Sequence, residues 1–458
     1  MTGTAAEPLP ASFLQRGLWP LARGAHPAEV THVRALRVTG DIDEERLTAA
    51  VRQVGAALPA LRVELADGDE PRLRVRPQAP EPLTVDLRGV AAAGRDAVCV
   101  ALLRADRDRP AAAGRHRSRF HLVRLTDDEI VLALTAHGLV LDAPSLYALL
   151  GAVCQAYTGR FRAGQYRDFT TLPGFDPLTD RARASRRRWW TRRLTALPGD
   201  PEKTAGAVGA GRATGTHRLR IPARRWQALG ALGGPLGGGG NGQLAVMALA
   251  AWCLRTPGQV ATSAFSTVVD LRDHLGLGPV VGPFTDRLVF TVDPGGPAPS
   301  FRDVLLRTQA GFLDAVVHYL PYGEVLELAV AAGRIAPPRT AAHWDVALRF
   351  CRNPPTSAAT KGERTLAERG LSIELFREAD LLGAATTVPA ERWDGTVLDL
   401  SLGELAEDTV LVLDADLNHT HHGTARHVLD RMDEALRAAV ADPDAPLPTP
   451  ADTARSHR

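Results

Sequence analysis

Ala136-His137-Gly138-Leu139-Val140-Leu141-Asp142-Ala143-Pro144-Ser145 is the most informative segment of the chain. An apolar run that predicts a strand, Ile130–Thr135, precedes it, and a run with helical periodicity follows it. A histidine at a strand end is held by the sheet while its ring faces open space, and imidazole titrates near neutral pH. His137 therefore suits a general base. Asp142 either balances charge in such a site or caps the helix that begins near Pro144, and these residues alone leave both interpretations open.

Predicted strands and helices alternate on both sides of this segment. Before it, strands are expected at Thr31–Thr39 and Phe120–Leu125. After it, the apolar positions of a helix are Leu146, Leu149, Leu150, Val153 and Tyr157. The second half predicts strands at Val260–Thr267, Arg287–Val292, Val346–Cys351, Thr396–Leu402 and Val410–Ala415, and helices at Phe301–Val317 and Thr424–Leu436. A strand, a histidine-bearing loop and a helix recur in both halves, which indicates two similar α/β lobes.

The composition is that of a globular protein with enough apolar residues for a core. Hydrophobic residues make up 45% of the 458 residues, and 54 basic against 52 acidic residues leave a formal net charge of +2. This balance argues against a dedicated nucleic-acid binder, which normally carries a large basic surplus. Arginines and tryptophans mix in the segment Arg181–Arg193. We interpret it as a solvated helix face, with electrostatic steering of an acidic partner as the alternative.

Neither a membrane span nor a metal site is expected. The start, Met1–Pro8, lacks the pattern of a signal peptide, and the longest apolar run, Leu244–Leu254, is far shorter than the roughly 20 residues of a span. A cytoplasmic protein is therefore expected. The four cysteines form no CxxC pair and predict buried thiols. His419, His421 and His422 lie close together without a carboxylate or cysteine to complete a metal site, so a solvated loop is expected.

Seven other segments carry motifs in a recognisable order. Leu9-Pro-Ala-Ser-Phe-Leu-Gln15-Arg-Gly-Leu18-Trp19 is similar to S-x-x-Q-x-x-L-W, and Tyr166-Arg-Asp168-Phe169 is similar to Y-x-D-F. The other segments are Gly40–Asp43 with Leu47 and Leu61-Arg62, Val281–Leu288, Pro321-Tyr322 with Glu324, Trp344–Asn353 and Val397–Leu402. With these motifs the chain resembles the condensation domains of nonribosomal peptide synthetases, within the chloramphenicol-acetyltransferase-like superfamily. The resemblance covers about Leu9 to Val440.

The resemblance implies roles for the residues of the central segment. The family motif is H-H-x-x-x-D-G, in which the second histidine is the catalytic one, described as a base or as a positioner of the attacking amine. Aligned without a gap, His137 takes the position of the first histidine, and Gly138 takes that of the catalytic one. Asp142 takes the position of the aspartate, which is mainly structural in the family, and Arg272 falls where its partner arginine is expected. Ser145 matches a serine that is common just after the motif.

Three positions depart from the family pattern. Glycine has no side chain, so residue 138 cannot itself handle a proton. Ala143 replaces the glycine of the motif. Asp286 stands where the family has asparagine, and its charge is expected either to line the mouth of the tunnel or to face water.

Three accounts of function follow. In the first, the protein joins a carrier-bound acyl thioester to an amine or hydroxyl acceptor by proximity, with His137 and backbone groups assisting; this condensation-type acyltransferase is the preferred account. In the second, a non-catalytic protein recruits another enzyme to a carrier-bound intermediate. In the third, the tunnel performs cyclisation or elimination. The family's cyclising branch has aspartate at the position of His137, which argues against membership of that branch.

The resemblance also implies an architecture and partners. An α/β fold of two acetyltransferase-like lobes is expected, in a V-shaped pseudo-dimer around a tunnel. The lobes are expected at residues 1–175 and 215–440, with an inter-lobe linker at 176–214 and a disordered tail at 441–458. Each lobe should contain a mainly antiparallel sheet. We expect a freestanding protein of natural-product biosynthesis without a cofactor or metal of its own. It would meet an acyl or peptidyl carrier protein in trans, and the carrier would present the substrate on its phosphopantetheine arm.

Overall fold

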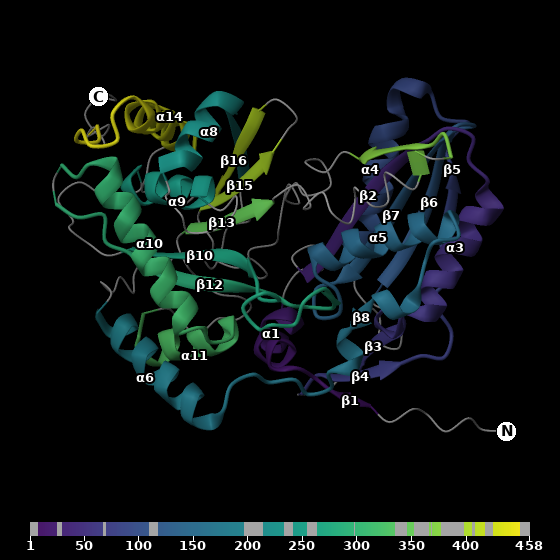
Figure 1. Cartoon of the computed structure of the whole chain (residues 1–458), viewed down its shortest axis with the longest axis horizontal. Helices are drawn as coiled ribbons and strands as arrows, with labels where there is room; N and C mark the ends of the chain where they lie inside the picture. The colour runs from purple at the N-terminus through teal and green to yellow at the C-terminus, as the bar shows by residue number, and fades with distance from the viewer. Residues whose placement is uncertain are drawn as a thin grey trace. The chain divides into compact units, whose positions relative to one another are not determined.

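Two compact units make up the computed structural model (Figure 1). The structure describes residues 8–24, 30–66, 70–109, 118–196, 214–232, 241–253, 263–296, 298–334, 346–351, 366–367, 369–376, 398–404, 408–416 and 425–448. Unit 1 consists of Met1–Pro177, Asp270–Thr285 and Pro354–Ala385. Unit 2 consists of Leu178–Val269, Asp286–Asn353 and Thr386–Arg458.

Unit 1 contains two segments from the second half of the chain, which differs from the expected continuous lobes 1–175 and 215–440. Backbone pairing holds both segments in place. Strand β11 (Val280–Val281) pairs in parallel with β8 (Arg167–Asp168), and β14 (Ser372–Leu375) pairs antiparallel with β2 (Thr31–Thr39). These pairings involve residues more than a hundred positions apart in the sequence, so local sequence patterns do not predict them.

A five-stranded sheet in the order β14-β2-β7-β6-β5 forms the centre of unit 1. Its other strands are β7 (Glu129–His137), β6 (Ser118–Thr126) and β5 (Leu83–Asp86). Neighbouring strands are antiparallel except β5 and β6, so the expected antiparallel character is confirmed for this unit. A smaller sheet contains β1 (Leu9–Pro10), β4 (Arg72–Val75) and β3 (Val63–Ala66).

Helices cover both faces of the five-stranded sheet. Helix α4 (Arg95–Arg107) packs against β2, β7 and β6, and α5 (Ala143–Tyr157) packs against β2 and β7. The core beneath α4 includes Val33, Ala35, Val131, Ala133, Cys99 and Leu103. Because side chains alternate along a strand, the even-numbered residues of β2 and β7 lie on the α5 face. Helix α3 (Glu44–Ala57) packs against α5, and α1 (Phe13–Gly24) opens the described chain after β1.

A six-stranded sheet in the order β12-β10-β13-β15-β16-β9 forms the centre of unit 2. The strands are β9 (Thr214–Pro222), β10 (Ser263–Asp270), β12 (Thr285–Val292), β13 (Val346–Cys351), β15 (Leu398–Glu404) and β16 (Asp408–Asp416). Strands β10, β13 and β15 pair in parallel, whereas β15, β16 and β9 pair antiparallel. These pairings are evenly divided, two parallel and two antiparallel, so a mainly antiparallel sheet stays a prediction for this unit. Long connections separate β10, β13 and β15 in the chain, and such connections allow parallel pairing where a hairpin would not.

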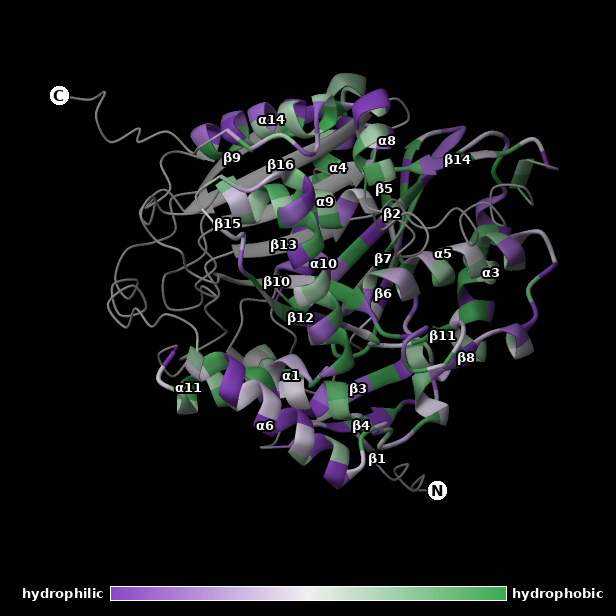
Figure 2. Cartoon of the chain, turned by 60° about the vertical axis from the view of Figure 1, so that its left-hand side comes forward, coloured by the Kyte–Doolittle hydropathy of each residue, from purple (hydrophilic) through white to green (hydrophobic). Residues whose placement is uncertain are grey.

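The helices of unit 2 are α6 (Asp180–Ala196), α8 (Ala223–Leu232), α9 (Asn241–Cys253), α10 (Phe301–Val317), α11 (Tyr322–Ala331) and α14 (Ala425–Ala441). Helix α6 lies in the expected linker 176–214, yet it has 17 residues and packs against α11 within unit 2. Figure 2 shows mostly hydrophilic residues along α6. Its buried anchor is Trp190, whose Nε1 donates to the carbonyl of His318 at 2.9 Å.

The start of the expected tail also differs from the prediction of disorder. The backbone N–H of Leu447 donates to the carbonyl of Pro299 at 2.9 Å, and the Leu447 side chain is buried. The carbonyl of Pro448 accepts from Trp252 Nε1 at 2.9 Å. Prolines suit such an extended strap, because it needs few backbone donors of its own. Residues 449–458 lie outside the described residues.

None of the helices that the structure describes has both the length and the apolar character needed to cross a membrane. The loop with His419, His421 and His422 lies outside the described residues. Within the described ranges, no group of three or more His, Cys, Asp or Glu side chains is placed to hold a metal ion.

Candidate functional site

The loop between β7 and α5 begins in a tight turn. The backbone N–H groups of Val140 and Leu141 both donate to the carbonyl of His137, at 2.8 and 3.1 Å. The N–H of Gly138 donates to the carbonyl of Val30 at 2.6 Å, which ties the loop to the residue just before β2. These bonds hold the backbone of residues 138–141 close to the end of the sheet.

The opening motif of the chain supports the same loop. Ser12 and Gln15 form a reciprocal cap at the start of α1, with Ser12 N donating to Gln15 Oε1 at 2.8 Å and Gln15 N donating to Ser12 Oγ at 3.3 Å. The amide nitrogen of Gln15 then donates to the carbonyl of Leu139 at 2.6 Å. Gln15 is buried, so this bond is shielded from water. The S-x-x-Q motif thus both starts a helix and holds the central loop.

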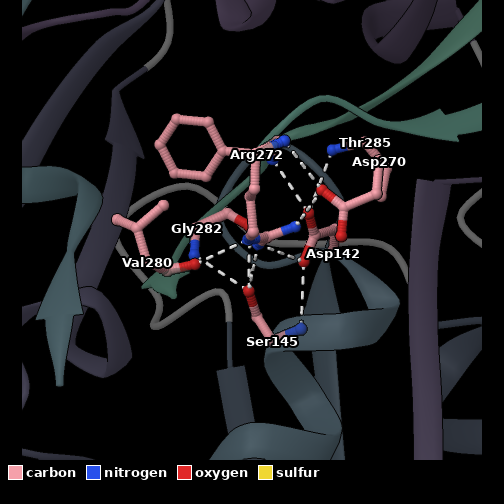
Figure 3. Close-up of polar contacts among 8 residues, drawn as sticks. Asp142, Ser145, Asp270, Arg272, Val280, Gly282 and Thr285 are labelled. Atoms are coloured by element: carbon pink, nitrogen blue, oxygen red, sulfur yellow. Dashed lines mark hydrogen bonds and ion pairs between the residues drawn. The ribbon is translucent and has the colours of Figure 1, made fainter. Parts of the chain in front are cut away.

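Asp142 is the N-cap of α5 and also the centre of a charged network (Figure 3). Its Oδ1 accepts from Ser145 N at 3.0 Å and from Arg272 Nη2 at 2.9 Å. Its Oδ2 accepts from the backbone N–H groups of Phe284 and Thr285 at 2.8 and 3.0 Å. Four donors occupy a carboxylate that is 1% exposed. The two interpretations left open by the sequence, helix cap and charge partner, are therefore both true of one side chain.

Arg272 completes the network from the segment before β11. Besides Asp142, its guanidinium donates to Val280 O at 2.7 Å, to Asp270 Oδ1 at 2.9 Å and to Ser145 Oγ at 2.9 Å. Burial lowers the pKa of the Arg272 guanidinium, whereas the negative charge of Asp142 raises it. The net effect is a pKa above the usual value for arginine. Arg272 therefore remains a cation although it is buried.

The hydroxyl of Ser145 is also fully engaged. It donates to Gly282 O at 3.0 Å, and it accepts from Gly282 N and from Arg272 Nη2, both at 2.9 Å. One donor and two acceptor positions are all that a hydroxyl offers. Ser145 and Asp142 thus fix the start of α5 to the segment around Gly282, and neither has a lone pair left for a substrate.

His137 accepts a hydrogen bond in the loop that follows it. The backbone N–H of Leu139 donates to His137 Nδ1 at 3.2 Å. An Nδ1 that accepts carries no proton, so the neutral ring has its proton on Nε2. In the neutral state the Nε2 edge of this half-buried ring is therefore a hydrogen-bond donor. This geometry favours a donor role over the general-base role expected from the sequence.

A second histidine, His32, lies against the position that lacks a side chain. A Cβ built on Gly138 would lie 3.1 Å from His32 Nε2, 3.2 Å from Val30 O and 3.6 Å from His32 Cδ2. No local sequence pattern points to His32, which stands 106 positions before Gly138. Antiparallel pairing brings them together, because β2 begins beside the end of β7 and Thr31 lies opposite His137.

Comparison with known proteins assigns the family. A model of the condensation domain matches residues 5–333. The chain belongs to the condensation-domain family. This match confirms the resemblance drawn from the sequence, and the solved relatives confirm the α/β fold.

Two solved structures and one curated relative illustrate the likeness. TlmII, described as a tallysomycin biosynthesis protein, is 47% identical with a TM-score of 0.78, and the match covers 96% of this chain and 100% of TlmII. The X-domain in a complex with OxyB from teicoplanin biosynthesis is 21% identical with a TM-score of 0.66, covering 97% of this chain and 95% of that one. The phosphinothricin tripeptide synthetase PhsC of Streptomyces viridochromogenes is 27% identical over 342 residues, which are 70% of this chain. The chain spans 31% of the length of PhsC and 7% of another curated relative.

Asp286, where the condensation-domain motif has asparagine, is buried in unit 2 rather than facing water. Its carboxylate accepts from the hydroxyl of Tyr319 at 2.5 Å, from Tyr322 N at 3.0 Å and from Arg287 N at 2.8 Å. Burial raises the pKa of Asp286 to about 6. The side chain fixes the start of α11 to β12, and its place at a tunnel mouth stays a prediction.

The pKa of Asp286 predicts a pH-dependent stability. A folded-state pKa near 6, above the usual 3.8, means that the folded protein binds the proton more tightly than the unfolded chain. Protonation of Asp286 therefore contributes fully to the stability of the fold below about pH 4. This contribution is lost as the pH rises through 6. Between pH 7.5 and pH 5 the protein should gain about 1 kcal/mol in free energy of unfolding relative to Asp286→Asn. Urea denaturation of both proteins at the two pH values measures this difference, and parallel pH profiles would contradict it.

The arginines of α6 divide into anchors and exposed residues. Arg183 and Arg187 both form ion pairs with Glu324 of α11. Arg186 donates to Tyr319 O at 2.8 Å, and Arg193 donates to Thr291 Oγ1 at 2.8 Å. The exposed arginines are Arg181, Arg188 and Arg192. Four of the seven arginines thus hold the helix in place, and the other three form the solvated face that the sequence predicts.

A buried polar cluster beneath α4 was also missed by sequence reasoning. His121 Nε2 lies 3.1 Å from Asp106 Oδ2, and Thr135 Oγ1 donates to the same oxygen at 2.7 Å. Arg119 donates to Asp106 Oδ1 at 2.6 Å. The alternation of β6 and β7 places these side chains on the face opposite α5. The cluster therefore belongs to the core on the α4 side rather than to the loop at Gly138.

Proposed function

We propose that this protein joins a carrier-bound acyl thioester to an amine or hydroxyl acceptor and forms an amide or an ester. Membership of the condensation-domain family supports this reaction class. The identity of 47% to TlmII supports a place in natural-product biosynthesis. The observation that carries the proposal is the closed network of Asp142, Ser145 and Arg272. Buried charges are costly to maintain, so their retention around a loop without its usual histidine supports a loop still held for chemistry.

The chemistry needs little beyond positioning when the acceptor is a free amine. The acceptor nitrogen or oxygen attacks the thioester carbonyl carbon, the new C–N or C–O bond forms, and the C–S bond breaks. The thiol of the phosphopantetheine arm leaves with the carrier protein, and the acceptor gives up a proton. Holding both reactants together supplies several kcal/mol of the barrier, in the order of 7–11 kcal/mol for ideal alignment. The phosphopantetheine arm is part of the substrate and belongs to the carrier.

In this proposal His137 donates a hydrogen bond to the developing oxyanion. Its Nδ1 accepts from Leu139 N, so the neutral ring carries its proton on Nε2. A preorganised donor of this kind stabilises the negative charge on the carbonyl oxygen during attack. The expected V-shaped pair of lobes with a tunnel stays a prediction, and the proposal places the substrate at the loop of residues 137–142.

Intact mass spectrometry tests the reaction class. A carrier protein from the neighbouring genes is charged with acetyl, octanoyl or aminoacyl phosphopantetheine and mixed with the protein and a free amine, an alcohol or an aminoacyl carrier. The expected product has the mass of the acyl group joined to the acceptor, and the carrier returns to its free-thiol mass. A changed acyl mass without acceptor would instead indicate cyclisation or elimination. Intact acyl-carrier in every combination would overturn the proposal.

His137→Ala is expected to lower turnover about 10²-fold, because it removes one donor to the oxyanion. The Michaelis constant should change little, since the donor acts mainly in the transition state. Rates with the charged carrier, for the wild type and the variant, measure this effect. A turnover number equal to that of the wild type would remove His137 from the mechanism.

Recruitment of another enzyme is the second candidate, and the absent side chain at Gly138 favours it. In that case the protein would bind the charged carrier without changing its mass. The X-domain from teicoplanin biosynthesis, a solved structure of similar fold, is in a complex with OxyB. Carrier binding measured by calorimetry together with an unchanged acyl-carrier mass would support recruitment over acyl transfer.

A further inference from the structure

Helix α6 has one buried side and one exposed side. Trp190 and Leu194 are its buried residues. On the other side, exposed residues follow one another at intervals of four, three, four and three positions, which places them along a single face of the helix. This surface, which we call the arginine face, consists of Arg181, Ser185, Arg188, Arg192 and Thr195.

The arginine face carries three positive charges and no carboxylate. Within the described part of the chain, no ion pair and no side-chain hydrogen bond engages the guanidinium of Arg181, Arg188 or Arg192. The arginines on the inner side of the helix differ in this respect, because Glu324 pairs with two of them. The charge that holds α6 in unit 2 and the charge that it presents to solvent are therefore separate sets of residues.

The helix that presents these charges is firmly fixed to its neighbours. Trp190 Nε1 donates to His318 O at 2.9 Å, and His318 is the C-cap of α10. The ring of Trp189 stacks on the ring of His318, with the centroids 4.2 Å apart and the planes 4° from parallel. Arg193 Nε donates to Thr291 Oγ1 of β12 at 2.8 Å. A partner on the arginine face therefore has to order only the three arginine side chains, which lowers the entropic cost of binding.

The surroundings of the arginine face favour a carboxylate-rich protein over a nucleic acid. Single-stranded nucleic acids bind where exposed aromatic rings stack on the bases. Trp190 is 1% exposed and Trp189 stacks on His318, so the aromatic rings of α6 are engaged within the protein. Ser185 and Thr195 are small, so they leave room for a second helix to lie along the face. Guanidinium groups match carboxylates with two parallel hydrogen bonds, which suits a row of aspartates or glutamates.

We propose that the arginine face of α6 is the surface on which the carrier protein docks, through a helix with exposed aspartates or glutamates. The inference rests on the proposed function for the identity of this partner, because the carrier presents the thioester in that reaction. Attraction between the guanidinium groups and the carboxylates speeds the encounter and weakens as the salt concentration rises. The arginine face thus captures the carrier and takes no part in the chemical step.

The test measures binding of the carrier protein used in the mass-spectrometry assay, in its free-thiol phosphopantetheine form. A variant that combines Arg181→Gln, Arg188→Gln and Arg192→Gln removes three charges from exposed positions. Calorimetry should show a dissociation constant about 10- to 100-fold higher than that of the wild type at about 50 mM salt, and a smaller difference at about 300 mM salt. With the charged carrier, the Michaelis constant should rise by a similar factor and the turnover number should stay the same.

A second triple variant, which combines Arg224→Gln, Arg426→Gln and Arg437→Gln, is the matched control. These arginines are also exposed and also lie in helices of unit 2, on α8 and α14. The control has the same net charge as the α6 variant and should bind the carrier as the wild type does. Equal losses of affinity in the two triple variants would mean that net charge alone acts, and would overturn docking at α6.

A charge swap tests direct contact. Arg188→Glu should weaken binding further than Arg188→Gln, because it places a negative charge opposite the acidic helix. Replacing the exposed carboxylates of the carrier one at a time with lysine should identify at least one carrier variant that binds Arg188→Glu more tightly than it binds the wild type. If none does, Arg188 is not in contact with the carrier and the proposed docking surface is wrong.

The outcomes also separate this inference from the proposed function. A wild type that transfers the acyl group, with a carrier affinity that the α6 variant leaves unchanged, would overturn the docking surface and leave the function standing. A carrier that binds through the arginine face but keeps its acyl group in every combination would overturn acyl transfer and leave the docking surface standing. If single-stranded DNA bound the wild type more tightly than the carrier does, and the α6 variant lost that binding, the surface would belong to a nucleic acid and the inference would fail.

Discussion

Arg272→Met is expected to destabilise the protein by about 3–5 kcal/mol, because it leaves the carboxylate of Asp142 buried without its cation. Asp142 would keep its three backbone donors, but the negative charge would lie in a site that is 1% exposed. The carbonyls of Val280 and Gly282 would also lose a donor. Urea denaturation measures the loss. Hydrogen exchange should show faster exchange at the amides of Ser145, Phe284 and Thr285, which donate to Asp142.

Arg52→Met is the matched control within unit 1. Arg52 pairs with Glu81 at 2.8 Å, almost the distance between Arg272 and Asp142, but the two side chains are 59% and 68% exposed. Water screens this pair, so its removal should change the free energy of unfolding by less than about 1 kcal/mol. Similar losses in Arg52→Met and Arg272→Met would contradict a structural role for the buried pair.

A double variant tests the pairing itself. Asp142→Asn combined with Arg272→Met removes both charges, so the loss should be smaller than the sum of the two single losses. Strict additivity would mean that the two side chains act independently, contrary to the 2.9 Å contact between them.

Regular elements could be predicted from the sequence where a periodic pattern was long and clear. The bounds Thr31–Thr39, Val346–Cys351 and Phe301–Val317 are the same in sequence and structure. Local periodicity and local caps are sufficient for such elements, and the capping box of Ser300 and Asp303 is an example. The cap at Asp142 was predictable for the same reason.

The long-range contacts of the site had no such local signal. The backbone donors to Asp142 at Phe284 and Thr285 follow 142 and 143 residues later, and a backbone N–H has no signature in the sequence. Arg272 could be named only through the family resemblance. His32 could have been found from the sequence only by pairing β2 with β7 and reading the register at their ends. The sequence motif points only to the loop in which residue 138 lacks an imidazole. The ring that lies next to Gly138 comes from His32 in the neighbouring strand β2.

The second large effect is expected for Gly311→Ala in α10. A Cβ on Gly311 would lie 2.1 Å from the carbonyl oxygen of Thr291 in β12, so the helix would have to move away from the sheet. Because the obstacle is backbone rather than a flexible side chain, the added methyl group should cost about 2 kcal/mol or more, after its gain in helix propensity. This corresponds to a decrease of roughly 5 °C in melting temperature for a unit of this size.

Gly230→Ala in α8 provides the matched control, and its expected effect on stability has the opposite sign. Both glycines lie in helices of unit 2, but a Cβ on Gly230 would lie 4.0 Å from Gly242 N, which is ordinary van der Waals contact. Alanine there should stabilise the protein by up to about 1 kcal/mol, because it limits the unfolded chain and favours the helix. Calorimetry of the two variants compares the same chemical change in two environments. If Gly311→Ala melted at or above the temperature of Gly230→Ala, the close packing of α10 on β12 would be wrong.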